Sequence, residues 1–138
     1  MSLRGGIGLP ELPLEDGQEF RLGIMGGTFD PIHYGHLVTA EQARESLDLD
    51  AVLFMPAGSP AFKLDKPVTP AEDRYAMTVL ATAANPAFLA SRFEIDRPGV
   101  TYTADTLHAL RDFYPSQVKL YFITGADAII DIVTWHDA

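Results

Sequence analysis

Four short apolar runs alternate with three longer stretches in which apolar positions recur every three or four residues. The apolar runs cover residues 20–25, 51–55, 88–95 and 118–123. Their lengths are typical of strands, whereas the periodic stretches, which begin near residues 34, 70 and 103, predict helices. The last helix is predicted to end at about Phe113. This order predicts βαβ units and therefore an α/β fold, a parallel sheet with helices on both faces.

Local signals refine the borders of these elements. Thr69 and Glu72 have the spacing of a capping box, with Pro70 between them at a favourable place for a helix start. The run 88–95 alternates only in part, which predicts a strand near the edge of the sheet. Residues 1–19 hold glycines, prolines and acidic residues with little periodicity. We therefore predict a flexible acidic arm over residues 1–19 and one folded domain over residues 20–138.

Composition narrows the class of function. The 19 acidic and 10 basic residues give a net charge of -9, which argues against a nucleic-acid partner. The chain has no cysteine, so disulfides and thiolate metal sites are excluded and a cytoplasmic location is favoured. No apolar run approaches the roughly 20 residues that a membrane span needs.

The segment between the first predicted strand and the first predicted helix carries the candidate chemistry. It reads Gly26-Gly27-Thr28-Phe29-Asp30-Pro31-Ile32-His33-Tyr34-Gly35-His36. Glycine has no Cβ, so Gly26 and Gly27 can take backbone angles closed to other residues and let a phosphate approach main-chain N–H groups. His33 and His36 are three residues apart, which places both imidazoles on one side of the first helical turn, above the expected anion site.

This segment has two other interpretations. His33, His36 and Asp30 contain the residue types of a metal site, but a third ligand would have to come from elsewhere and the HExxH pattern is absent, so no metal site is predicted. A purely structural glycine turn does not explain the histidines. The GxGxxG fingerprint is also missing, which disfavours a hydride-transfer enzyme.

Over these eleven residues the chain resembles the nucleotidyltransferases with a His-x-Gly-His signature, and within them nicotinate-nucleotide adenylyltransferase, an enzyme of NAD synthesis. The resemblance implies a Rossmann-like nucleotidyltransferase sheet of strand order 3-2-1-4-5. Strands 1 and 4 are then neighbours at the topological switch point, where ligands bind beyond the carboxyl ends of strands. The fifth strand is expected to be missing from this chain, which would leave an unpaired edge.

The resemblance also implies roles for individual residues. The catalytic residues it implies are His33, His36 and Lys63. The ATP-binding residues are Gly26, Gly27, Thr28, Phe29, His33, His36, Gly125 and Asp127. The residues that bind nicotinate mononucleotide are Thr101, Tyr102, Thr103, Trp135 and His136.

Several of these positions have a second interpretation. Lys63 has the alternative of being a solvated loop lysine. Thr103 has the alternative of capping the third helix, and Asp127 that of capping a helix expected after it. The family commonly has a histidine where Phe62 stands and a tyrosine where His136 stands. Arg74 resembles a basic residue of the family, but we expect it at the surface or in an ion pair.

The implied reaction is adenylyl transfer from ATP to nicotinate mononucleotide, with Mg²⁺ carried by the ATP phosphates and no covalent nucleophile on the protein. A later family motif that binds ATP phosphates has no match, so the 138-residue chain is expected to be an incomplete part of a family member, with weak or no catalysis. Alternatives are pantetheine-phosphate adenylyltransferase, a cytidylyltransferase, or a non-catalytic nucleotide-binding fragment. The oligomeric state is left open, with a homo-oligomer among the options.

Overall fold

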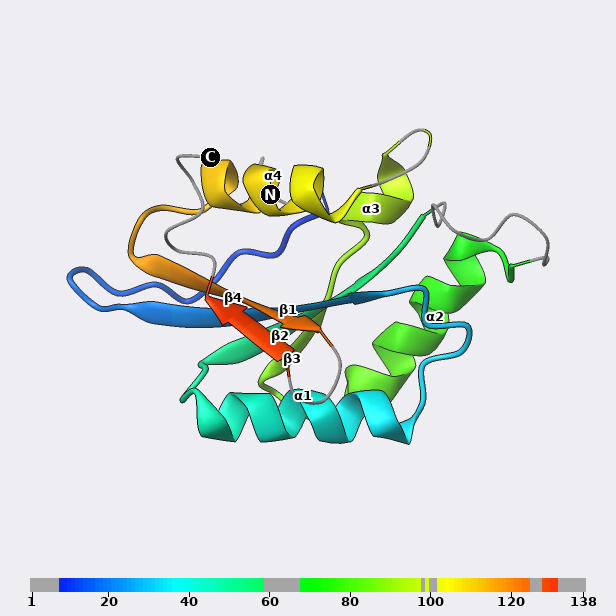
Figure 1. Ribbon diagram of the computed structural model, residues 1–138, viewed down its shortest axis with the longest axis horizontal. Helices are drawn as coiled ribbons and strands as arrows, with labels where there is room; N and C mark the ends of the chain where they lie inside the picture. Colours follow the sequence, from blue (N-terminus) through cyan, green and yellow to red (C-terminus); the bar gives the residue numbers. More distant parts are fainter. Residues whose placement is uncertain (1–7, 59–67, 98, 100–101, 125–127, 132–138) are drawn as a thin grey trace.

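The computed structural model describes residues 8–58, 68–97, 99, 102–124 and 128–131. In these residues one five-stranded sheet has the strand order β3-β2-β1-β4-β5 (Figure 1). The strands are β1 (Phe20–Gly27), β2 (Ala51–Pro56), β3 (Phe88–Ala90), β4 (Val118–Thr124) and β5 (Ala128–Asp131). The helices are α1 (Tyr34–Ser46), α2 (Ala71–Thr82), α3 (Phe93–Asp96) and α4 (Thr103–Phe113).

The first four strands confirm the predicted parallel order 3-2-1-4. β1 pairs in parallel with both β2 and β4, and β2 pairs in parallel with β3. In this register Ile24 of β1 lies opposite Leu53 of β2 and Phe122 of β4. β1 is therefore the central strand, and its carboxyl end lies beside that of β4 as predicted.

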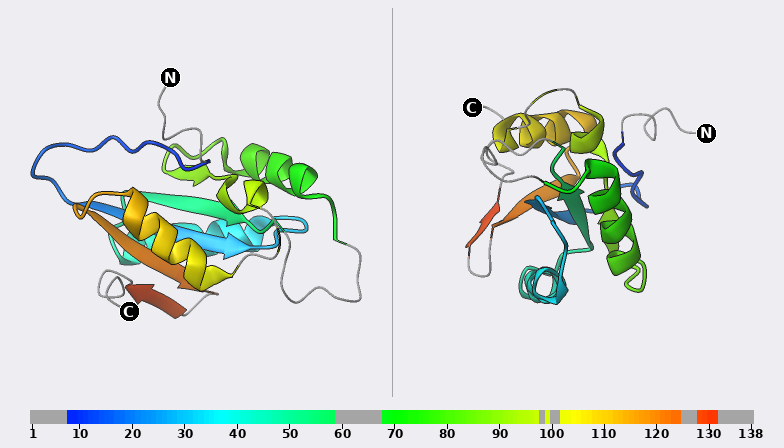
Figure 2. Two further views of the ribbon diagram at one scale, coloured as in Figure 1. Left: turned by 90° about the horizontal axis from the view of Figure 1, so that it is seen from above. Right: turned by 90° about the vertical axis from the view of Figure 1, so that its right-hand side faces the viewer.

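Two apolar layers cover the sheet because successive side chains of a strand point to opposite faces. Leu22 and Ile24 of β1 belong to the core layer that contains Leu107 and Leu110 of α4. Met25, the next residue of β1, belongs to the layer that contains α1. Figures 1 and 2 show α4 and α1 on opposite sides of the sheet.

The region after β4 differs from the prediction. Residues 128–131 form β5, which pairs antiparallel with β4 so that Thr124 lies opposite Ala128, and the expected helix does not begin here. Ile129 and Ile130 are β-branched, which favours a strand, and β5 pairs with the edge of β4 that does not contact β1. The expectation of an unpaired edge at β4 is therefore wrong, because β5 covers this edge, although β5 is antiparallel and is not the parallel fifth strand that the resemblance implies.

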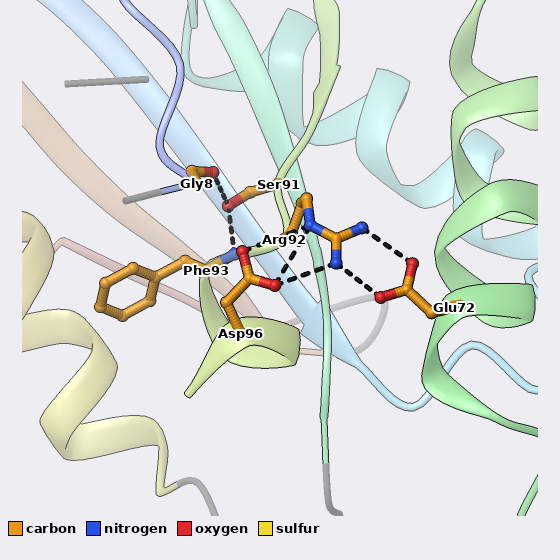
Figure 3. A network of polar contacts seen from close by, with 6 residues as sticks. All are labelled: Gly8, Glu72, Ser91, Arg92, Phe93 and Asp96. Atoms are coloured by element: carbon orange, nitrogen blue, oxygen red, sulfur yellow. Dashed lines mark hydrogen bonds and ion pairs between the residues drawn. The ribbon is translucent and has the colours of Figure 1, made fainter. Parts of the chain in front are cut away.

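The run 88–95 is also divided differently from the prediction. Only Phe88–Ala90 is a strand, and Phe93–Asp96 forms the short helix α3. The Ser91 hydroxyl accepts a hydrogen bond from the backbone N–H of Phe93 at 3.0 Å, which turns the chain out of the sheet (Figure 3).

The predicted capping box at the start of α2 is wrong. The N-cap is Pro70, and no side chain of the described residues caps it. Thr69 instead donates its backbone N–H to Asp30 Oδ2 at 2.9 Å. The Glu72 carboxylate is bound to the guanidinium of Arg92, so neither capping-box side chain serves the cap (Figure 3).

Residues 8–19, the described part of the predicted arm, are attached to the domain. Leu9 is 1% exposed and belongs to the core layer of α4. The Ser91 hydroxyl donates to the Gly8 carbonyl at 2.7 Å, and the Tyr114 hydroxyl donates to the Pro10 carbonyl at 2.6 Å. Sequence reasoning missed this attachment because one buried leucine among prolines and acids has no periodicity.

Candidate functional site

The end of β1 and the loop after it form one wall of the candidate site. The Gly27 carbonyl accepts a hydrogen bond from the backbone N–H of Ala57 at 2.8 Å, which ties this end to the end of β2. Neither Gly26 nor Gly27 has a positive φ, so the conformational freedom of glycine is not used at these two positions. Gly27 instead provides space, because a Cβ at this position would lie 3.0 Å from the ring of Phe29.

The left-handed conformation belongs to Phe29, whose φ is +53°. For a residue other than glycine this conformation costs about 1–3 kcal/mol and persists only where the surroundings impose it. The Phe29 ring is 3% exposed and meets the His36 ring edge-on, with 5.0 Å between ring centroids. The buried Phe29 ring therefore packs against the His36 ring.

His33 and His36 cap the first turn of α1 reciprocally. His33 is the N-cap, and its Nδ1 accepts a hydrogen bond from the backbone N–H of Gly35 at 3.1 Å. Nδ1 of His36 accepts from the backbone N–H of His33 at 3.0 Å. These bonds satisfy N–H groups that the start of a helix leaves without partners. The rings stack with centroids 3.9 Å apart, which confirms that both imidazoles lie on one side of this turn.

The capping contacts fix the chemistry that each ring presents. A neutral imidazole whose Nδ1 accepts a hydrogen bond carries its proton on Nε2. Both histidines thus offer an Nε2–H donor. Burial lowers the pKa of His36, and the neighbouring His33 lowers it further, so His36 is held in this neutral form at pH 7.

A cavity of about 520 Å³ opens beside the two histidines. Its walls come from the end of β1, the first turns of α1 and the end of β4. The lining residues are Met25, Gly26, His33, Gly35, His36, Thr39, Phe122 and Ile123. The cavity therefore lies where the carboxyl ends of β1 and β4 meet, the position at which ligands bind in open parallel sheets.

Of the predicted ATP-binding residues, Gly26, His33 and His36 lie together at this cavity. Gly27, Thr28 and Phe29 lie next to it in the chain but are not among its lining residues. Sequence reasoning missed Thr39 and Phe122. Thr39 is three residues beyond His36 on the same helix, so helical spacing would have identified it. Phe122 follows only from the pairing of β4 with β1.

Arg74 differs most from its predicted position. It is 1% exposed rather than at the surface, and its guanidinium donates to backbone carbonyls. Burial lowers its pKa, whereas the charge of Asp30 raises it. The sequence pattern of α2 does not predict the burial of Arg74, because its partners are main-chain atoms of three other segments.

The predicted mononucleotide-binding residues are described only in part. Tyr102 is the N-cap of α4 and is 59% exposed, and Thr103 is the first residue of that helix. Thr103 is therefore not the helix cap, and the Tyr102 side chain makes no capping hydrogen bond. The remaining predicted site residues lie outside the described residues: Lys63, Thr101, Gly125, Asp127, Trp135 and His136.

The described part of the chain contains no group of three His, Cys, Asp or Glu side chains placed to hold a metal ion. In the same residues no helix is long and apolar enough to cross a membrane.

Comparison with known proteins agrees with this geometry. The family described as cytidylyltransferase-like matches residues 24–138. The chain belongs to the cytidylyltransferase-like family. Within the family, the resemblance to nicotinate-nucleotide adenylyltransferases is confirmed by curated relatives of that name. A protein from Moorella thermoacetica named "Probable nicotinate-nucleotide adenylyltransferase" is 63% identical over 117 residues, which are 85% of this chain and 54% of the relative.

A relative of the same name from Thermoanaerobacter sp. is 57% identical over 121 residues, 88% of this chain and 57% of the relative. This member of the cytidylyltransferase-like family thus spans about half the length of the curated relatives it matches. A solved structure titled as Plasmodium falciparum nicotinic acid mononucleotide adenylyltransferase complexed with NaAD has a TM-score of 0.63 at 20% identity, covering 75% of this chain and 51% of that one. This likeness confirms the nucleotidyltransferase fold.

Proposed function

We propose that the protein to which this chain belongs transfers the adenylyl group of ATP to nicotinate mononucleotide, giving deamido-NAD and pyrophosphate in NAD synthesis. One observation carries the proposal. Two imidazoles, fixed by the helix start that they cap, line a cavity at the switch point of a parallel sheet. The names of the relatives supply the substrate class.

In this reaction a phosphate oxygen of the mononucleotide forms a bond to the α-phosphorus of ATP. The bond between that phosphorus and the oxygen bridging to the β-phosphate breaks, and its electron pair leaves with pyrophosphate. Negative charge grows on the phosphate oxygens during the step, so donors fixed in advance lower the barrier. The Nε2–H groups of His33 and His36 are suited to this role, and the N-terminus of α1 adds favourable potential.

Magnesium enters this proposal as part of the substrate MgATP. The lining residues of the cavity include two imidazoles and a threonine hydroxyl but no carboxylate, so in the described part of the chain the phosphates are the ion's best ligands. Lys63 is proposed to neutralise the leaving pyrophosphate. Thr101, Tyr102, Thr103, Trp135 and His136 are proposed to bind the mononucleotide, and Gly125 and Asp127 the ATP ribose and phosphates.

A pyrophosphate-release assay on the full-length protein tests the proposal. Nicotinate mononucleotide and nicotinamide mononucleotide are compared as acceptors with ATP, and phosphopantetheine with ATP and a CTP reaction serve as controls for the other nucleotidyltransferases. We expect the highest kcat/KM with nicotinate mononucleotide. Binding of ATP without pyrophosphate release from either mononucleotide would contradict the proposal and favour a nucleotide-binding module. A cytoplasmic location stays a prediction, and the oligomeric state stays open.

A further inference from the structure

Arg74 of α2 is the only buried charged side chain among the residues that the structure describes. Its Nε donates to the carbonyl of Thr69 at 2.7 Å. One Nη donates to the carbonyls of Thr28 at 2.9 Å and Ala57 at 2.6 Å, and the other donates to the carbonyl of Gly58 at 3.0 Å. A single guanidinium thus joins the loop after β1, the loop after β2 and the segment that leads into α2.

The geometry of these bonds makes them hard to replace. A buried cation is costly unless its donors are satisfied, and the rigid fork of a guanidinium can hold several acceptors at fixed angles. A lysine ammonium is a single point with three donors, so it cannot reach acceptors spread around such a fork. The three segments are therefore held in one mutual arrangement for as long as Arg74 is in place.

One of these acceptors lies in the candidate site's own loop. The Thr28 carbonyl belongs to the peptide that precedes Phe29, so fixing its direction also fixes the direction of the Phe29 N–H. Phe29 holds the left-handed φ of +53°, and its ring is nearly perpendicular to the His36 ring, with the two centroids 5.0 Å apart. A second tie acts on the same loop, because Asp30 accepts from the N–H of Thr69, whose carbonyl binds Arg74.

We propose that Arg74 is a positioning residue for adenylyl transfer: it holds the Thr28–Asp30 turn in its strained form and, through the ring of Phe29, sets the orientation of His36. The inference rests on the proposed function for its catalytic consequence. Arg74 itself does not line the cavity and is not assigned any contact with substrate.

The test compares Arg74→Lys with Arg92→Lys in the full-length protein. Arg92 is a matched control, because it also uses Nε and both Nη atoms and also binds α2, through Glu72, but it joins α2 to Asp96 of α3 (Figure 3). For each variant kcat, KM for ATP, the melting temperature and the NMR titration of His36 are measured, with kinetics taken well below the melting temperature.

We expect Arg74→Lys to lower kcat about tenfold to a hundredfold, the loss typical of a misplaced catalytic group, with a smaller change in KM. The His36 titration is expected to shift as its ring loses the wall formed by Phe29. Arg92→Lys is expected to lower the melting temperature at most, with kcat and the His36 titration unchanged. An Arg74→Lys protein that is less stable but has wild-type kcat, KM and His36 titration would overturn the proposal.

A second variant covers the case in which Arg74→Lys does not fold. Phe29→Leu keeps an apolar side chain in the core but removes the ring that packs against His36, so we expect it to lower kcat and shift the His36 titration. Wild-type values for Phe29→Leu would overturn the proposal too. If the wild-type protein releases no pyrophosphate with either mononucleotide, the proposed function fails, whereas the His36 titration still decides whether Arg74 positions this ring.

Discussion

His33 and His36 each accept a backbone N–H of the same helical turn, and their rings stack 3.9 Å apart. Their Nδ1 atoms complete the start of α1, while their Nε2–H groups remain as donors beside the cavity. The two roles depend on the same tautomer. A proton added to Nδ1 of either ring would remove the acceptor that the backbone N–H uses, so acid should weaken the helix start and the anion site together.

The stability of the domain should therefore depend on the protonation of His36. Its pKa is lowered from 6.5 by burial and by His33, so just below pH 6.5 the unfolded chain binds a proton that the folded chain does not. The contribution of His36 to the free energy of unfolding is fully present above pH 6.5 and is lost as the pH falls through the folded-state pKa. Denaturant unfolding at a series of pH values measures this.

His36→Asn is the control for this pH dependence, because an amide oxygen can accept the His33 N–H without titrating. As the pH is lowered through this window, we expect the free energy of unfolding to fall more in the wild type than in His36→Asn. A difference that is constant with pH would show that His36 does not couple protonation to folding.

The catalytic contribution of His36 is tested by His36→Ala in the full-length protein. A donor aimed at developing charge acts mainly in the transition state, so kcat should fall about 10²–10³-fold while KM for ATP rises much less. Tyr34→Ala is the matched control from the same turn, because Tyr34 is 79% exposed and does not line this cavity. Near wild-type kcat for His36→Ala would show that the imidazole is peripheral.

The central sheet and the histidine pair could be predicted from the sequence because both depend on local patterns. Apolar runs identified β1, β2 and β4, and the three-residue spacing placed His33 and His36 on one side of a helical turn. β3 is shorter than predicted because the Ser91 hydroxyl accepts the Phe93 N–H, a bond that the partial alternation of residues 88–95 does not reveal.

The buried features of the site could not be predicted in this way. Arg74 binds carbonyls 5 to 46 residues away in the chain, and no periodicity records such main-chain partners. The left-handed φ is at Phe29 rather than at the two glycines before it, because the buried ring and its neighbours impose it. These features arise from tertiary packing, which overrides local preference.

The attachment of residues 8–19 predicts a stability effect. Leu9 is fully packed in the core layer of α4, so Leu9→Ala should lower the free energy of unfolding by about 2–5 kcal/mol through lost burial and a cavity. Leu80→Ala is the control, because Leu80 is 77% exposed and its truncation should change stability by about 0.5 kcal/mol or less. Thermal or urea unfolding measures both. Equal effects of the two variants would mean that residues 8–19 are a loose arm after all.

Gly23 and Gly26 of β1 should respond differently to an added side chain, because Gly23 faces the core and Gly26 lines the cavity. A Cβ at Gly23 would lie 2.8 Å from Leu49 Cδ1 and 3.1 Å from Ile123 Cδ1, so Gly23→Ala should overpack the core and cost about 1–3 kcal/mol. A Cβ at Gly26 meets nothing closer than Phe122 Cε1 at 3.9 Å, but Gly26 lines the cavity. Gly26→Ala should therefore keep its stability and weaken ATP binding.

Calorimetric titration with MgATP and thermal unfolding of both variants test this contrast. We expect the affinity for ATP to fall in Gly26→Ala and to stay close to wild type in folded Gly23→Ala, since only the former adds a methyl group where a phosphate would approach the main chain. Unchanged ATP affinity in Gly26→Ala would place the phosphates away from the end of β1. The roles proposed for the two imidazoles would then have to be assigned to another ligand.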